Sequence, residues 1–252
     1  FRFTGHLPLP ADAAGNPWRL LGRRGDGPIP AILDDATANG SGPSPDEEVA
    51  AAAKKPTADL PTSDMVRTPT FAALWVAFCL GTTAGQMMIS QLVPFMRSVG
   101  LSATQAALAI TIAAIGNAGG RILSGALSDS LGRLTTLKVM IVGSLLVMSA
   151  LGMGTSQIVA LYVLVAAGYW CYGTQLSVFA STTADYFGAK NLGLNYGALF
   201  TAWGTAGILG PLVAGKVYDA SGTYQYALYA ASACALVAFA ALSLTRPIRE
   251  TA

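Results

Sequence analysis

Acidic residues are scarce in most of this sequence, and their scarcity decides its class. Charged residues make up 11% of the 252 residues, whereas a soluble domain carries about 25%. Nine of the 13 acidic residues precede Met65, and residues 66–246 contain three, Asp129, Asp185 and Asp219. A stretch of that length with so few carboxylates cannot present a soluble surface.

The sequence also has few histidines and cysteines and a small net charge, and each of these features excludes a class of function. The one histidine, His6, lies in a proline-rich segment, and the three cysteines have neither metal-ligand nor disulfide spacing. A formal charge of +2 is too small for a nucleic-acid footprint. The sequence has no paired carboxylates and no phosphate-binding glycine loop. We therefore expect no enzyme, no cofactor, no metal site and no nucleic-acid partner.

The first 65 residues differ in composition from the rest of the chain. They hold nine of the 13 prolines and few aliphatic side chains. Such a segment cannot bury enough apolar surface to offset the entropy of ordering it. We predict a disordered cytoplasmic segment over residues 1–65, a six-helix transmembrane bundle over residues 66–246 and a cytoplasmic tail over residues 247–252.

Six long apolar runs make up the predicted bundle. They cover residues 70–96, 103–127, 134–153, 157–180, 194–217 and 224–245. Each run is long enough to cross a hydrocarbon core of about 30 Å as a helix. A soluble helical bundle does not fit, because no run has the polar face that a soluble helix needs. The fold class is therefore an all-α polytopic membrane protein with six transmembrane helices.

Basic residues flank the apolar runs unequally. The side that would hold the N-terminal segment has Arg67, Arg133, Lys138 and Lys190, and the other side has Arg97 and Lys216. Positive residues accumulate on the cytoplasmic side of a membrane. We expect an integral protein of the cytoplasmic membrane with both ends of this chain in the cytoplasm.

An internal repeat relates the two halves of the predicted bundle. The pattern Gly-x-x-x-Asp-x-x-Gly occurs at residues 125–132 and again at residues 215–222, 90 positions later, and Gly120 matches Gly210 at the same offset. Three spans make up each copy, so the copies would cross the membrane in opposite directions. Secondary transporters commonly have this inverted arrangement.

Arg121 is the charged residue that we place deepest inside a predicted span. An arginine near the membrane centre costs about 2.5–3.5 kcal/mol on insertion scales, so it should face a cavity or a partner. In one interpretation its guanidinium binds a substrate carboxylate through paired hydrogen bonds. In the other it is a structural gate residue that pairs with Asp129 or with carbonyls at a helix end.

Polar and aromatic residues inside the spans are further candidates for lining a cavity. They are Gln86, Gln91, Asn117, Tyr169, Trp170, Tyr172, Gln175 and Trp203. Glycines concentrate in the second and fifth spans, where Gly116 and Gly120 would let two helices approach closely. We also expect Gly210–Pro211 to interrupt the fifth helix.

The stretch Gly125-Ala-Leu-Ser-Asp129-Ser-Leu-Gly132-Arg133 resembles the loop signature of the major facilitator superfamily. Two longer stretches, residues 182–197 and 200–211, resemble the oxalate/formate antiporter family within it. The resemblance implies that the six spans form the C-terminal half of a twelve-helix carrier, one 3+3 inverted repeat. The partner would be the N-terminal six-helix half, and residues 1–64 would be the loop that joins them.

The resemblance also implies a function and site residues. The family moves small organic anions by alternating access, and its oxalate carriers bind two carboxylates with an arginine in helix 8 and a lysine in helix 11. Arg121 matches the arginine, and Trp203 stands where the lysine is expected. The substrate would then be a monocarboxylate such as formate, lactate or pyruvate. The substrate-binding candidates are Arg121, Trp203, Trp170, Tyr172, Gln175 and Gln86.

The signature loop would control gating rather than binding. Its candidates are Gly125, Asp129, Gly132 and Arg133. Asp129 would stabilise one closed state by facing a helix N-terminus or a cation, and Arg133 would face the anionic inner leaflet. Two alternatives stay open at this point: a major facilitator carrier of drugs or sugars, and a membrane sensor or scaffold with the same fold.

Overall fold

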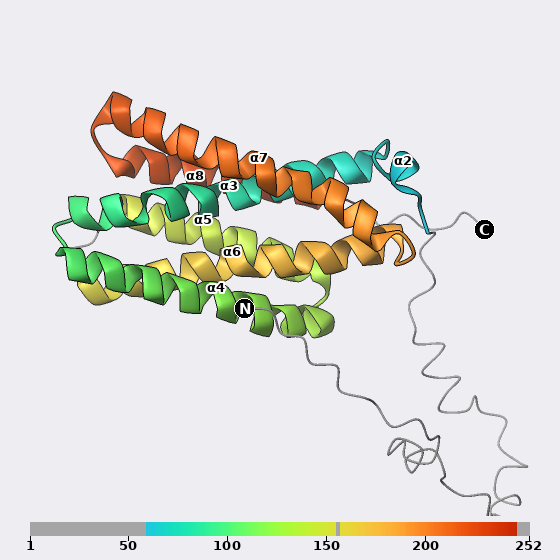
Figure 1. The fold of residues 1–252 in the computed structure, drawn as a ribbon, viewed down its shortest axis with the longest axis horizontal. Helices are drawn as coiled ribbons and strands as arrows, with labels where there is room; N and C mark the ends of the chain where they lie inside the picture. The colour runs from blue at the N-terminus through green and yellow to red at the C-terminus, as the bar shows by residue number, and fades with distance from the viewer. Residues whose placement is uncertain (1–58, 155–156, 246–252) are drawn as a thin grey trace, which may run out of the picture. The chain divides into compact units, whose positions relative to one another are not determined.

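The computed structural model describes residues 59–154 and 157–245. Most of the predicted disordered segment and the whole predicted tail lie outside these residues. The described chain is helical throughout (Figure 1), with elements α2 (Thr62–Met65), α3 (Pro69–Ser98), α4 (Ala103–Leu131), α5 (Arg133–Met153), α6 (Ile158–Phe187), α7 (Leu192–Ser221) and α8 (Tyr224–Ser243).

The six long helices confirm the predicted fold class. Each of them, α3 to α8, is long and apolar enough to cross a membrane. Some extend beyond the apolar runs; α6, for example, continues from residue 180 to Phe187. Its last turns contain Thr182 and Thr183, whose hydroxyls donate back to the carbonyls of Val178 and Phe179. Both hydroxyls are thus satisfied within the helix, and these polar residues do not interrupt it.

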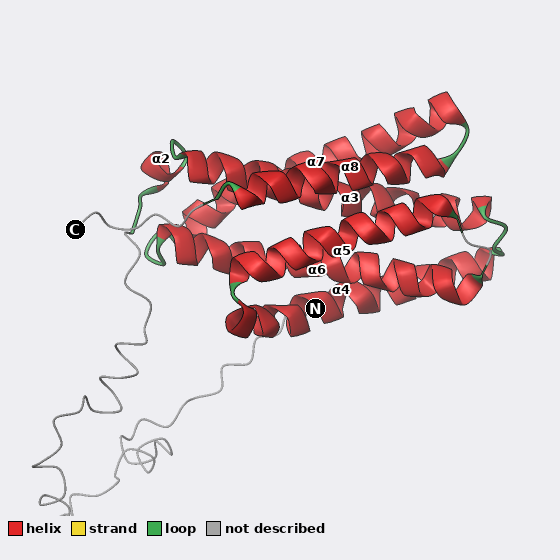
Figure 2. Cartoon of the chain, turned by 180° about the vertical axis from the view of Figure 1, so that it is seen from behind, coloured by secondary structure: helices red, strands yellow, loops and turns green. Residues whose placement is uncertain are grey.

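The packing of the helices has the symmetry of an inverted repeat. In this repeat α3, α4 and α5 correspond to α6, α7 and α8. The extensive contact between α4 and α6 therefore has its counterpart in the contact between α7 and α3, and the contact between α3 and α8 has its counterpart between α6 and α5. All four contacts are present. Figures 1 and 2 show α3, α7 and α8 grouped on one side of the bundle and α4, α5 and α6 on the other. Each group therefore combines helices from both copies.

Equivalent glycines make equivalent contacts in the two copies. A Cβ at Gly116 or Gly120 of α4 would collide with the α6 backbone, at Ala166 and Trp170. A Cβ at Gly210 of α7 would lie 2.9 Å from the backbone nitrogen of Met87 in α3. Small residues thus bring α4 onto α6 and α7 onto α3, as close helix packing in membranes requires.

The expected interruption at Gly210–Pro211 is wrong. Helix α7 is continuous from Leu192 to Ser221, with Pro211 inside it. A proline removes one backbone hydrogen bond, and neighbouring helices can compensate for this loss within a membrane. The tight contact of Gly210 with α3 holds the segment in place, so the helix continues.

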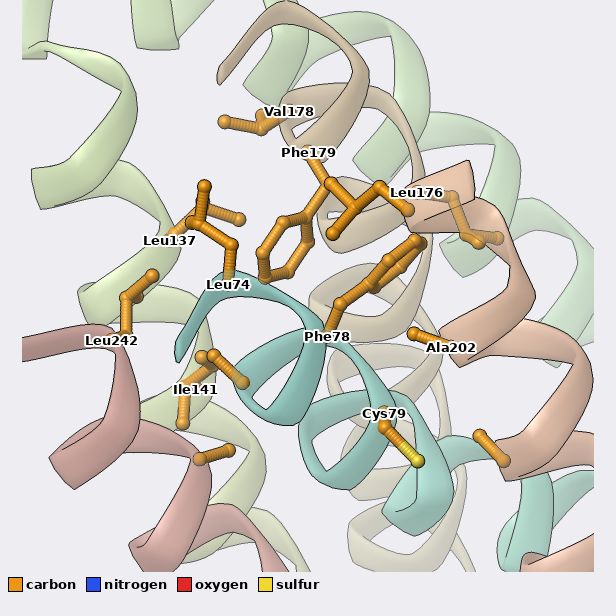
Figure 3. Packing of buried hydrophobic residues seen from close by; sticks show 14 of the residues in the cluster. Leu74, Phe78, Cys79, Leu137, Ile141, Leu176, Val178, Phe179, Ala202 and Leu242 are labelled. Carbon is orange, nitrogen blue, oxygen red and sulfur yellow. The ribbon is translucent and has the colours of Figure 1, made fainter. Parts of the chain in front are cut away.

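A buried aromatic and aliphatic cluster joins the two groups of helices at the end of the bundle where α3 begins. Phe78 of α3 stacks on Phe179 of α6 with ring centroids 4.3 Å apart. Leu74, Ile141 and Leu242 surround this pair and bring α5 and α8 into the cluster (Figure 3). Tyr172 of α6 belongs to the same cluster and Trp203 of α7 packs against it, so the cluster reaches toward the middle of the bundle.

Residues 59–65 correct the predicted boundary of the disordered segment. Leu60 donates its N–H to the carbonyl of Phe187 and accepts hydrogen bonds from the side chains of Asn191 and Asn195. Met65 is fully buried. The composition of the long segment concealed this short docking sequence, because its partners lie more than 120 residues further along the chain.

Candidate functional site

Arg121 lies four residues beyond the middle of α4, or about 6 Å toward the Leu131 end. Its side chain is exposed on the surface of the bundle. Its Nε donates to the Oδ1 of Asn117, one turn earlier, at 3.2 Å. This is its one hydrogen bond within the described part of the chain. A charge at this depth is costly in lipid, so it requires a polar or protein-covered environment.

Tyr172, Trp203 and Gln86 form a hydrogen-bonded cluster from three helices. The Trp203 Nε1 donates to the Tyr172 hydroxyl at 2.7 Å, and the Gln86 Nε2 donates to the same oxygen at 3.2 Å. Gly85 makes room for the ring of Tyr172, because a Cβ there would collide with it. Three residues far apart in sequence thus meet at one hydroxyl group.

The hydrogen of the Tyr172 hydroxyl is available to a further acceptor. A tyrosine hydroxyl has one donor and acceptor capacity on its oxygen, and indole N–H groups can only donate. Within the described residues, the Tyr172 hydroxyl accepts from Trp203 and Gln86 and donates to no partner. The cluster therefore contains a hydroxyl hydrogen that a further acceptor could bind.

The cluster and Arg121 belong to one polar region at mid-depth. Tyr172 is at the middle of α6 (Ile158–Phe187). Asn117, the hydrogen-bond partner of Arg121, packs against Gly173, the residue that follows Tyr172 in α6. Sites of secondary transporters lie near the bilayer midplane at the interface between repeats. Helices α3, α4, α6 and α7 supply this region.

Trp170 and Gln175 lie elsewhere and contact neighbouring helices. The Trp170 Nε1 donates to Ser124 of α4 at 2.8 Å, and its ring covers Gly119. Gln175 is 1% exposed and packs against Gly81 of α3. These contacts give both side chains a place in helix packing, and the cluster at Tyr172 does not include them. Their substrate-binding role stays a prediction.

Arg133 connects three helices at the signature loop. It forms ion pairs with Asp129 of α4 and, at 3.7 Å, with Asp185 of α6. It also donates to the Ser128 hydroxyl and, at 3.5 Å, to the Gly125 carbonyl. Within residues 59–154 and 157–245 these ion pairs do not include Arg121. Pairing of Arg121 with Asp129, one of our two interpretations, is therefore absent from this conformation.

Sequence patterns alone do not reveal several residues of this region. Tyr196 is not among the predicted site residues, although its hydroxyl donates to the carbonyl of Leu176, one turn beyond Tyr172 in α6. The sequence places Asp185 near a span end and gives no sign of its pairing with Arg133. Asn117 is a predicted cavity residue, and its spacing of four from Arg121 is a helical-contact signal that the sequence does contain. Among the described residues, no group of three or more His, Cys, Asp or Glu side chains is placed to hold a metal.

Six apolar helices in two inverted triplets define a polytopic integral membrane protein with a mid-depth polar region. The family model of the Major Facilitator Superfamily matches residues 40–169 and 74–252. The chain belongs to this superfamily. The match confirms the resemblance in the signature loop and points to transport rather than catalysis.

Two curated relatives narrow the resemblance. The chain is 33% identical over 154 residues to the oxalate:formate antiporter of Oxalobacter formigenes, which is 60% of this chain and 37% of that protein. It is 29% identical over 151 residues to the MFS-type transporter YhjX of Escherichia coli strain K12, or 60% of this chain and 38% of the relative. The matched region is thus less than half the length of either relative.

Proposed function

We propose that this chain is the C-terminal six-helix half of a secondary active carrier that moves small organic anions by alternating access. The complete carrier would reside in the cytoplasmic membrane, with both ends of this chain in the cytoplasm. The family membership and the antiporter relative support the transport activity. The unequal distribution of basic residues at the span ends supports the orientation.

Arg121 is the observation that carries the anion proposal. It is an exposed guanidinium at mid-depth on α4, and the ion pairs among the described residues leave it out. A guanidinium binds a carboxylate through two parallel, charge-assisted hydrogen bonds. The hydroxyl hydrogen of Tyr172 adds a neutral donor next to the position where Asn117, the partner of Arg121, packs on α6. A carboxylate would satisfy both groups.

Trp203 supports a monocarboxylate rather than a dicarboxylate. Its N–H is occupied by Tyr172, and one face of its indole stacks on Phe200 with centroids 4.9 Å apart. It therefore supplies apolar surface and no positive charge. A dianion that faced Arg121 alone would keep one unpaired charge, and burying an ion costs several kcal/mol. Formate, lactate and pyruvate avoid this penalty.

Arg133 supports a gating role for the signature loop. Its contacts with Asp129, Ser128 and Asp185 join α4, α5 and α6 at one end of the bundle. Such a network stabilises the arrangement of helices that it spans, and another arrangement must break it. The loop would therefore set the balance between inward-facing and outward-facing states.

Competition for uptake tests the proposed function. Cells that express the full-length carrier would be given radiolabelled lactate, formate or oxalate, with each unlabelled anion as competitor. We expect monocarboxylates to compete best and Trp203→Lys to shift preference toward oxalate, because it restores a second cation. Preference of the unmodified carrier for oxalate would disprove the monocarboxylate assignment, and uptake insensitive to every carboxylate would disprove the anion assignment.

A further inference from the structure

The Nε atom of Arg121 is already engaged by its own helix. It donates to the Oδ1 of Asn117 at 3.2 Å. Arginine can only donate hydrogen bonds, so the Asn117 atom that faces it must be the amide oxygen. The orientation of the Asn117 amide is therefore fixed by its partner. Spacing of four along α4 places the two side chains on one face of the helix.

Helix α6 packs against Asn117 of α4. A Cβ on Gly173 would collide with the main-chain carbonyl of Asn117 and would lie 2.7 Å from its Oδ1. Gly173 is buried and Asn117 is half-buried. The absence of a side chain at position 173 leaves the space in which the amide oxygen sits. Two helices, α4 and α6, thus determine where the Nε of Arg121 is held.

The hydrogen bond from Nε to Asn117 determines which edge of the Arg121 guanidinium remains available to bind a carboxylate. A guanidinium presents five N–H donors in a planar fork, so a carboxylate can approach along the Nε edge or along the edge between the two Nη atoms. Asn117 occupies the Nε position. Within the described residues, the two Nη atoms have no partner. The available edge is the one at the end of the side chain.

We infer that Asn117 is a positioning residue, which directs the terminal Nη edge of Arg121 toward the substrate carboxylate. The inference rests on the proposed function, since it specifies how the proposed anion site achieves its geometry. Binding along this edge places the carboxylate in line with the arginine side chain. The amide also fixes the side chain in advance, which lowers the entropy cost of binding.

Two substitutions of Asn117 separate positioning from packing. Asn117→Asp keeps the shape of the side chain and adds a carboxylate that pairs with Arg121 and competes with the substrate. Asn117→Leu has a similar size and removes the acceptor. We expect both to raise the half-saturation concentration for radiolabelled lactate by about tenfold or more, the scale of one charge-assisted hydrogen bond, with Asp having the larger effect. The maximal rate should change less than about twofold once protein amount is matched.

Thr104→Asp is the matched control, because Thr104 is an exposed residue of α4 near the opposite end of the helix. It adds the same charge to the same helix and should leave half-saturation unchanged. Arg121→Ala in the same full-length carrier tests the proposed function itself and should abolish carboxylate affinity.

The outcomes distinguish the two ideas. If Arg121→Ala abolishes affinity while both Asn117 variants keep it, the positioning inference is wrong and the proposed function stands. If Arg121→Ala keeps affinity, the anion site is wrong. A fall in maximal rate alone for Asn117→Asp would assign Asn117 to packing and overturn the inference. Should Asn117→Leu not reach the membrane, Asn117→Ala decides, because it also removes the acceptor of the Arg121 Nε and adds no charge.

Discussion

The segment Gly125–Arg133 and its counterpart Gly215–Thr223 both end their helices at a glycine with a positive φ. Gly132 (φ 87°) terminates α4 and Gly222 (φ 70°) terminates α7, and each follows an aspartate by three residues. A left-handed backbone favours glycine, which explains why both copies have it. In the first copy, Arg133 follows the glycine and connects three helices, whereas Thr223 follows it in the second and caps α8.

The same contrast extends into the helices. Ninety residues separate Arg121 from Pro211, so the anion-site candidate and the proline inside α7 occupy equivalent positions. Gly120 and Gly210, one residue earlier in each copy, both touch the backbone of a facing helix. The difference teaches that the repeat preserves close packing at this position, while a charged side chain follows the glycine in the first copy only.

The largest expected effect is at the Arg121–Pro211 pair. Arg121→Lys keeps the charge but loses the planar fork, so we expect affinity for the carboxylate substrate to fall by about 100-fold, the scale of a bidentate charge-assisted pair. Pro211→Ala should change affinity by less than about threefold. Direct binding to the purified full-length carrier measures both. Equal losses of affinity in Arg121→Lys and Pro211→Ala would show that substrate binding is not confined to the first copy at this position.

Equivalent glycines should respond alike. Gly120→Ala and Gly210→Ala should each destabilise the folded protein by about 1–3 kcal/mol, because a Cβ would be forced against the facing helix. Gly215→Ala is the control, since nothing lies within 4 Å of its Cβ position. Thermal unfolding in detergent compares the three variants. A similar loss at Gly215 would indicate a general effect of glycine replacement.

Residues 59–65 dock on the turn between α6 and α7, whereas the repeat-equivalent turn between α3 and α4 has no such segment among the described contacts. Asn195 is fully buried and bonds to Thr62 and to the Leu60 carbonyl. Asn195→Ala should cost about 1–3 kcal/mol locally, because it removes two hydrogen bonds that tie residues 60 and 62 to α7.

Limited proteolysis would detect the release of this segment. Tryptic cleavage after the exposed Arg67 should accelerate in Asn195→Ala. Asn191→Ala is the milder control, because its one side-chain bond goes to a carbonyl that Asn195 also satisfies. Unchanged cleavage in the Asn195 variant would show that other contacts hold residues 59–65.

The smallest expected effect on affinity is at Asp129 and Asp219, the aspartates that occupy equivalent positions in the two copies. Asp129→Asn weakens the Arg133 network and should slow transport by about two- to tenfold with substrate affinity unchanged. Asp219→Asn removes a charge that lies outside the ion pairs of the described residues, and should change the rate by less than about twofold. Uptake kinetics of the full-length variants would test this. A stronger effect at Asp219 would reverse the comparison.

Much of the fold can be predicted from hydrophobic length alone. All six spans are located in this way, and the observed helices begin within two residues of the predicted runs. Their ends are less accurate: α4 runs to Leu131 and α6 to Phe187, because serine, threonine and aspartate can extend a helix beyond the hydrocarbon. The predicted break at Pro211 and the predicted disorder of residues 59–65 are wrong for a different reason. Both depend on contacts with helices distant in sequence.

The sequence predicts individual residues of the candidate site, but it does not predict how they are arranged in space. Residue type and depth single out Arg121, Tyr172, Trp203 and Gln86. Composition cannot separate Trp170, which packs on Gly119 and bonds to Ser124, from Trp203, which bonds to Tyr172. Both are tryptophans inside apolar spans, and the face that each presents depends on how its helix is rotated.

The sequence by itself determined the membrane class, the number of spans, the inverted repeat and the scarcity of charge, because each depends on local composition and on spacing along one chain. Tertiary structure decided that Arg133 joins Asp129 and Asp185, and that three helices meet at the Tyr172 hydroxyl. Hydrogen bonds and ion pairs between helices require a particular rotation and separation of those helices. In this protein, close contacts at Gly120 and Gly210 set that geometry, and these contacts exist only in the folded bundle.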